Sequence, residues 1–98
     1  MAPRSDDASP PARMARITGR VQGVGFRAWT REEALRRGLD GWVRNEPDGA
    51  VRTLISGPDG ALADMLAALH RGPAFARVTL VETTPADPPE HPGFHILR

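Results

Sequence analysis

A glycine-rich segment near the start of the chain joins a short apolar run directly to a helix-like stretch. Residues 19–27 read GRVQGVGFR. Glycines let backbone N–H groups approach a ligand closely, and the N-terminus of the following helix adds unpaired N–H donors and a positive dipole. Arg27, in the first turn of that helix, adds a guanidinium that can hold two oxygens at once. The segment therefore predicts a strand, a turn and a helix that together bind an anion, and a phosphoryl group fits best.

Length and composition limit what the rest of the chain can add. Its 98 residues allow one domain with a single core, and 13 arginines against 12 acidic residues leave a net charge of +1. This balance gives no broad attraction to nucleic acid or to an anionic membrane. The chain has no cysteine, so disulfides and thiolate chemistry are excluded. Its three histidines lack metal-ligand spacing, so we expect neither a metal nor a cofactor; they are His70, His91 and His95.

The N-terminal residues differ in character from the rest. Residues 1–12 are small and polar and contain three prolines, which predicts a disordered tail before a single domain at residues 13–98. The tail has no apolar core of a signal peptide, and no window of the chain approaches the length of a membrane span. We expect a cytoplasmic monomer that does not bind membranes.

Hydrophobic periodicity and turn residues divide the domain into seven elements. We expect strands over residues 14–22, 42–45, 50–56, 77–82 and 94–98, helices over 26–37 and 61–71, and an irregular loop over 84–92. Gly38 is expected to end the first helix, and Asp59 to cap the second. The Asp48-Gly49 pair predicts a hairpin turn between the second and third strands.

The order of these elements, βαββαβ with a further terminal strand, indicates an α+β fold. It matches the ferredoxin-like sandwich, in which two helices cover one face of an antiparallel sheet. In that topology the turn after the first strand and the end of the second strand can lie side by side. Asn45, which ends the second strand, would then lie next to the anion-binding turn.

Two segments resemble the signatures of a known family. The nonapeptide 19–27 resembles the first signature of the acylphosphatases, and residues 41–45 are similar to the second, with Gly49, Val51 and Gly57 following at the expected spacing. The similarity runs from about Arg13 to the end of the chain. It implies the ferredoxin-like fold and hydrolysis of acyl phosphates without a metal. Arg37 departs from the pattern, because an apolar residue is more usual there.

The resemblance also implies site residues. Arg27 would bind the phosphoryl group and Asn45 would orient the attacking water, and the phosphate-binding segment would comprise Gln22, Gly23, Val24, Gly25, Phe26 and Arg27. These residue types suit the chemistry. The departing carboxylate belongs to an acid with a pKa of about 4, so no strong general acid is needed. Phosphoryl transfer depends mainly on positioning and charge stabilisation, and a carboxamide can accept a hydrogen bond from water without repelling phosphate.

Three other functions fit parts of the pattern. Residues 23–28 match the dinucleotide fingerprint G-x-G-x-x-G/A, but the hairpin after the first helix and the short chain argue against that fold. A ferredoxin-like RNA-binding module would need a run of stacking aromatics that this chain lacks. A non-catalytic phosphate-binding domain would retain anion affinity without turnover, and Asn45 argues against it. We expect Trp42 to pack beneath the site, and Thr30 to serve helix packing.

Overall fold

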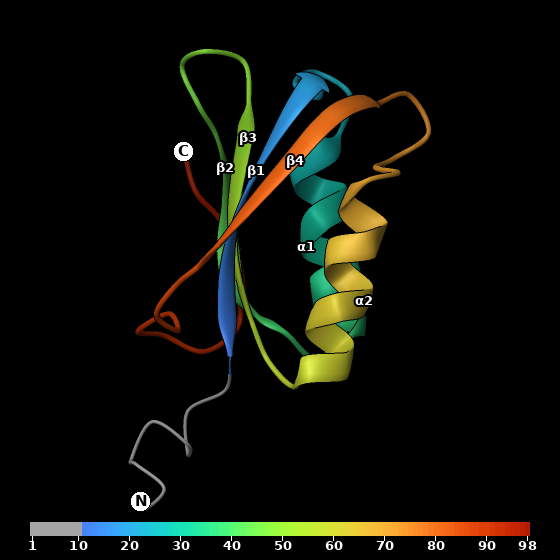
Figure 1. Cartoon of the computed structure of the whole chain (residues 1–98). Coiled ribbons are helices and arrows are strands. Elements are labelled where there is room, and N and C mark those ends of the chain that lie inside the picture. The colour runs from blue at the N-terminus through green and yellow to red at the C-terminus, as the bar shows by residue number, and fades with distance from the viewer. Residues whose placement is uncertain (1–10) are drawn as a thin grey trace, which may run out of the picture.

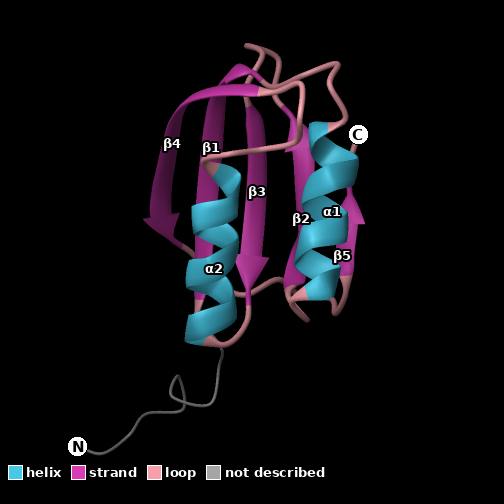
Figure 2. Cartoon of the chain, turned by 90° about the vertical axis from the view of Figure 1, so that its right-hand side faces the viewer, coloured by secondary structure: helices cyan, strands magenta, loops and turns pink. Residues whose placement is uncertain are grey.

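Two helices lie on one face of a single five-stranded sheet (Figure 1). The computed structural model describes residues 11–98. Along the chain the elements are β1 (Ala12–Arg20), α1 (Phe26–Arg36), β2 (Asp40–Asn45), β3 (Val51–Ser56), α2 (Asp59–Leu69), β4 (Arg77–Pro85) and β5 (Phe94–Ile96). The strands are ordered β4-β1-β3-β2-β5 across the sheet (Figure 2). The predicted ferredoxin-like α+β architecture is therefore confirmed.

The sheet is mixed, because its last strand runs parallel to its neighbour. β1, β3, β2 and β4 pair antiparallel, as expected, whereas β5 pairs in parallel with β2. The start of β5 is held by Asp40, whose carboxylate accepts a 2.8 Å hydrogen bond from the Gly93 N–H. The Gly41 N–H in turn donates to the Gly93 carbonyl at 2.9 Å. These bonds place β5 at the edge of the sheet opposite β4.

Several boundaries differ from those expected, among them the start of β1 and the end of β4. β1 begins at Ala12, one residue before the predicted domain boundary, because Ala12 already pairs with Ser56 of β3. Residues 1–10 of the predicted tail lie outside the described part of the chain. β4 continues to Pro85 rather than ending at Glu82, since Thr84 and Pro85 still pair with β1. Long-range pairing with β1 thus extends β4 into the predicted loop.

The helix ends follow different rules. Gly38, at φ +70°, ends α1 as expected: its N–H bonds to the Leu35 carbonyl at 3.1 Å and the Leu39 N–H to the Ala34 carbonyl at 2.9 Å, the Schellman pattern. The expectation for α2 was wrong. Pro58 occupies the N-cap without a side-chain bond, and Asp59 is the first helical residue. There its carboxylate complements the positive end of the helix dipole instead of capping it.

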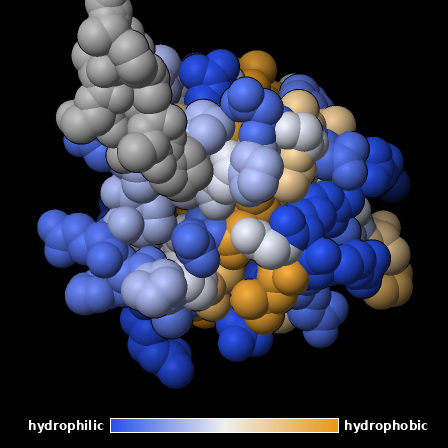
Figure 3. Space-filling model, turned by 90° about the horizontal axis from the view of Figure 1, so that it is seen from below, coloured by the Kyte–Doolittle hydropathy of each residue, from blue (hydrophilic) through white to orange (hydrophobic). Residues whose placement is uncertain are grey.

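The core fills the space between the sheet and the helices. Buried side chains from both layers form one cluster, which includes Ile17, Val43, Val51 and Ile55 from the sheet and Phe26, Ala34, Leu62, Met65 and Leu69 from the helices. At Gly41 of β2 an added Cβ would overlap the Leu54 carbonyl of β3, so this position requires glycine. Figure 3 views the end of the molecule where α2 begins, and hydrophilic side chains there surround a small hydrophobic group.

Arg37, where an apolar residue was expected, joins the two helices by ion pairing. Its guanidinium donates to the Glu33 carboxylate at 2.6 Å and to the Glu33 carbonyl at 3.0 Å, and its Nε lies 3.7 Å from the Asp64 carboxylate of α2. The side chains of Arg37 and Glu33 are only 18% and 15% exposed. The hydrogen bond from Arg37 lowers the pKa of Glu33 more than burial raises it.

This ion pair should make stability depend on pH on the acid side. Because the pKa of Glu33 is lower in the folded chain, its contribution is complete above the unfolded pKa, about 4.3, and is lost as the pH falls through the folded pKa. Glu33→Gln should therefore reduce the free energy of unfolding by about 1 kcal/mol at pH 7. Urea unfolding of both proteins between pH 7 and pH 2 should show this difference shrinking; a constant difference would contradict it.

Candidate active site

The sheet register brings two distant segments to the same edge. β1 and β2 both run antiparallel to β3, so their C-terminal ends lie on either side of the start of β3. Ile17 of β1 and Asn45 of β2 both pair with Val51. The turn that follows β1 therefore lies close to Asn45, as the topology predicted.

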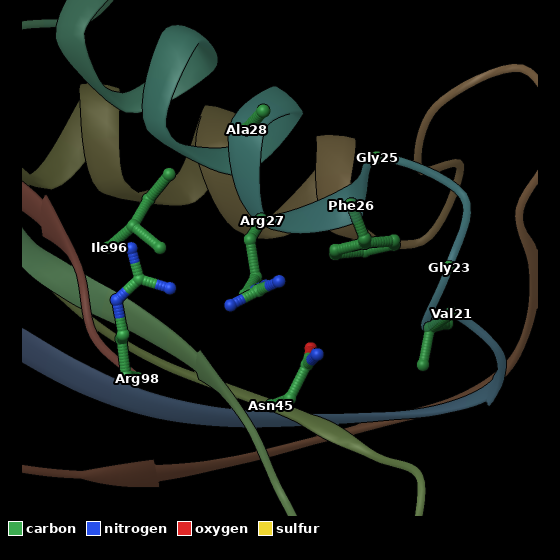
Figure 4. A pocket seen from close by; sticks show the side chains of 9 residues that line it. All are labelled: Val21, Gly23, Gly25, Phe26, Arg27, Ala28, Asn45, Ile96 and Arg98. Atoms are coloured by element: carbon green, nitrogen blue, oxygen red, sulfur yellow. The ribbon is translucent and has the colours of Figure 1, made fainter.

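A cavity of about 410 Å³ opens at this edge, between the start of α1 and the sheet. Its walls come from the turn, the first turn of α1, the end of β2 and the segment after Phe94; they are Val21, Gly23, Gly25, Phe26, Arg27, Ala28, Asn45, Ile96 and Arg98 (Figure 4). Five predicted site residues thus meet in one cavity: Gly23, Gly25, Phe26, Arg27 and Asn45. Gln22 and Val24 do not line it.

The turn has a continuous run of backbone donors without partners among residues 11–98. Gly23 and Gly25 adopt φ +77° and +80°, and Gly25 is the N-cap of α1 with no side-chain cap. The first helical bond runs from the Trp29 N–H to the Gly25 carbonyl at 3.0 Å. Within residues 11–98, no group accepts a hydrogen bond from the backbone N–H groups of residues 22–28. Such a run beside a helix N-terminus is an anion-binding arrangement.

Core packing fixes the first turn of α1 and so directs Arg27 outwards. Phe26 is buried and meets Trp29 edge to face, with ring centroids 5.3 Å apart. The buried Thr30 hydroxyl donates to the Phe26 carbonyl at 2.8 Å, which confirms its packing role. Because Phe26 points into the core, the next side chain, Arg27, projects into the cavity (Figure 4).

Arg27 and Asn45 approach the cavity from opposite walls with their polar groups unengaged. Figure 4 shows the Arg27 side chain descending from α1 and the Asn45 amide rising toward it from β2. Neither side chain forms a hydrogen bond or an ion pair with another of the described residues. No carboxylate among residues 11–98 therefore neutralises the positive charge of Arg27, and the Asn45 amide is available to a ligand or to water.

Gln22, predicted to bind phosphate, uses its side chain elsewhere. Its amide nitrogen donates to the carbonyls of Glu46 and Ala50, at 2.9 and 2.8 Å. It therefore ties the turn after β1 to the hairpin that follows Asn45. Val24 is half-buried and packs against the core. Phosphate binding by their backbone N–H groups stays a prediction.

The hairpin has its own polar bracing. Asp48 accepts a hydrogen bond from the Ala50 N–H at 3.1 Å and pairs with Arg16 of β1. The hydrogen bond from the Ala50 N–H lowers the pKa of Asp48 most, and the hydrogen bond from Arg16 lowers it further. Glu46 accepts a 2.7 Å hydrogen bond from Arg44. These contacts hold the hairpin, and with it the end of β2, against β1.

The expectation that Trp42 packs beneath the site was wrong. Side chains alternate along a strand, so Trp42 lies on the face of the sheet opposite Asn45. There it lines a separate hollow with His91, His95 and Leu97, among others, and Arg44 stacks 4.8 Å from its ring centroid.

Ile96 and Arg98 enter the cavity without having been identified from the sequence. β5 pairs in parallel with β2, with Val43 opposite Ile96, and the Leu97 N–H donates to the Val43 carbonyl at 2.8 Å. Continuing this register brings Arg98 beside Asn45. The alternation of residues 94, 96 and 98 could have placed them on one face, but nothing in the sequence identifies β2 as the partner of β5.

Residues 11–98 contain neither a cluster of metal-ligating side chains nor a helix that could cross a membrane. Among residues 11–98, no group of three or more His, Cys, Asp or Glu side chains is placed to hold a metal ion. No described helix is long and apolar enough to span a membrane.

The Gln22 bonds make a prediction about its role. Gln22→Ala removes two part-buried hydrogen bonds and should lower the free energy of unfolding by about 1–3 kcal/mol. Phosphate affinity should change less than about three-fold, because the Gln22 side chain bonds to the hairpin and does not line the cavity. A ten-fold change would correspond to about 1.4 kcal/mol. Urea unfolding and phosphate titration by calorimetry measure the two effects. A large loss of phosphate affinity at unchanged stability would instead show that the Gln22 amide contacts the anion.

Known proteins are similar to this chain both in sequence and in fold. The model of the acylphosphatase family matches residues 13–96. The chain is 59% identical over 88 residues to the acylphosphatase of Rhizobium meliloti strain 1021, and the aligned region covers 89% of this chain and 93% of that protein.

Solved structures agree. The acylphosphatase of Bacillus subtilis superimposes with a TM-score of 0.85 at 39% identity, over 90% of this chain and 99% of that one. The acylphosphatase of Coxiella burnetii gives a TM-score of 0.87 at 26% identity, over 93% of this chain and 96% of that one. Together with the cavity that brings Arg27 and Asn45 together, these similarities establish that the chain belongs to the acylphosphatase family.

Proposed function

We propose that this cavity hydrolyses the carboxyl-phosphate anhydride bond of acyl phosphates, the reaction for which the family is named. The products are a carboxylate and inorganic phosphate. In this proposal the turn at residues 22–28 and Arg27 hold the phosphoryl group, and Asn45 orients the attacking water. The observation that carries it is that backbone N–H groups, a guanidinium and an amide, none with a partner among residues 11–98, surround one cavity.

Each part has a physical task in the reaction. The N–H groups and Arg27 bring fixed positive potential to the non-bridging phosphoryl oxygens, where charge is held in the transition state. The Asn45 amide oxygen accepts a hydrogen bond from the water, which limits the directions from which the water can attack phosphorus.

The bond changes balance without a further reactant. The water oxygen forms a bond to phosphorus as the bond from phosphorus to the acyl oxygen breaks, and the electron pair leaves with the carboxylate. That carboxylate is the base of an acid with a pKa of about 4, so it leaves without being protonated. The phosphate product itself is a suitable acceptor for the proton that the water loses.

A cytoplasmic location, a monomeric state and the absence of a nucleic-acid partner, all expected from the sequence, stay predictions. Size-exclusion chromatography with light scattering would test the monomer directly. A mass near twice the 10.6 kDa of the chain would contradict it.

The proposal predicts that Asn45→Ala loses turnover and keeps the phosphate site. Its kcat for benzoyl phosphate, measured without added metal, should fall about 10²–10³-fold, the usual effect of removing one positioned polar group. The inhibition constant for phosphate should stay nearly constant. Wild-type protein should cleave the anhydride but not p-nitrophenyl phosphate, whose leaving group is poorer. A fully active variant would contradict the role of Asn45, and a folded wild-type protein that binds phosphate without cleaving benzoyl phosphate would be a non-catalytic phosphate-binding domain.

Arg27→Gln should lose phosphate inhibition together with activity. Because the guanidinium is the main charge facing the phosphoryl group, kcat/KM should fall by about 10³ or more. Arg36→Gln is the matched control, since Arg36 is an exposed residue in the last turn of α1, away from the cavity. Equal losses in the two variants would show a general effect of charge rather than a contact at Arg27.

A further inference from the structure

We propose that Arg98 binds a second anionic group on the acyl part of the substrate, so that this site favours acyl phosphates that carry a carboxylate. The inference rests on the proposed function, because it takes the phosphoryl group to lie against the turn and Arg27. It then assigns the remaining part of the cavity to the acyl group.

Arg98 lies on the far side of Arg27 from the turn. In Figure 4 Gly23 and Gly25 are on one side of Arg27, and Arg98 and Ile96 are on the other. The guanidinium of Arg98 points into the cavity toward Arg27. Parallel pairing with β2 holds the preceding residues in place through the bond from the Leu97 N–H to the Val43 carbonyl.

The charges in the cavity call for a ligand with two negative groups. The lining residues include two arginines and no acidic side chain. Within residues 11–98, neither Arg27 nor Arg98 pairs with an acidic side chain. Two like charges that face one cavity repel each other, and a ligand with an anionic group near each would relieve this repulsion. A phosphoryl group at the turn satisfies Arg27 and leaves Arg98 available.

The cavity also has the size and the walls for an organic group between two charged ends. Its volume of about 410 Å³ falls within the range of small-molecule sites, about 300–1,000 Å³. Ile96, two residues before Arg98, gives an apolar surface beside Arg98 and is 40% exposed. A short carbon chain can lie against it while its terminal carboxylate reaches Arg98.

The test uses phosphonates, which bind without being hydrolysed. We compare 3-phosphonopropionate and 4-phosphonobutyrate with their neutral carboxamides by isothermal titration calorimetry at pH 7.5. Wild-type protein should bind at least one carboxylate about ten-fold more tightly than its carboxamide, as expected for a charge-assisted bond of about 1.4 kcal/mol. Arg98→Gln should remove this preference and leave the carboxamide affinity within about two-fold, the usual scatter for a residue that does not contact the ligand. Arg36→Gln, with the same loss of charge outside the cavity, should keep the preference.

The outcomes separate this inference from the function on which it rests. If wild-type protein binds both members of each pair equally, or if Arg98→Gln keeps the preference, the role of Arg98 is overturned and the proposed hydrolysis stands. If Arg98→Gln weakens carboxylate and carboxamide alike, Arg98 binds the phosphoryl group instead. If wild-type protein binds no phosphonate, the placement of the phosphoryl group fails, and the role of Arg98 fails with it.

Discussion

The pairing of β3 between β1 and β2 is the constraint on which the site depends. Val51 pairs on one side with Ile17 and on the other with Asn45, so the ends of two strands far apart in sequence lie at one edge. A slip of one residue in the pairing of β2 with β3 would turn Asn45 to the opposite face, because side chains alternate along a strand. Gly41 contributes to this register, since only glycine fits where β2 passes the Leu54 carbonyl. The same pairings that bury the core therefore fix the site.

The ion pairs among the described residues form away from the cavity and leave its two arginines without a carboxylate side chain as partner. Arg16, Arg37, Arg44 and Arg52 all have carboxylate partners, which brace the hairpin or the two helices. Arg27 and Arg98 face the cavity without such partners among the described residues. Because an anion is attracted most strongly to charges that no carboxylate neutralises, this division favours ligand binding at the cavity. The Gln22 amide ties the glycine-rich turn at the cavity to the hairpin that the ion pairs brace.

Local chemistry explains which predictions from the sequence were confirmed. The glycines of the turn, the periodic helices and the Asp48-Gly49 hairpin are governed by nearest neighbours, and the structure has each of them. The two wrong expectations have different causes, because that for Asp59 concerns where a helix begins and that for Trp42 concerns surroundings that come from elsewhere in the chain. Asp59 had the chemistry of a cap, but the helix starts one residue earlier than that role needs. Trp42 lies on the face that strand alternation and pairing assign to it, away from the site.

The sequence by itself determined the order of elements, the glycine-rich turn and, through its resemblance to the acylphosphatases, the choice of Arg27 and Asn45 as candidate site residues. Tertiary structure alone decided that Gln22 braces the hairpin, that β5 runs parallel to β2, and that Arg98 enters the cavity. The physical reason is the range of the interactions. Turns and helices form through contacts between residues near in sequence. The position of Arg98 depends instead on the pairing of β5 with a strand about fifty residues earlier, and that pairing depends on how all the strands of the sheet are arranged.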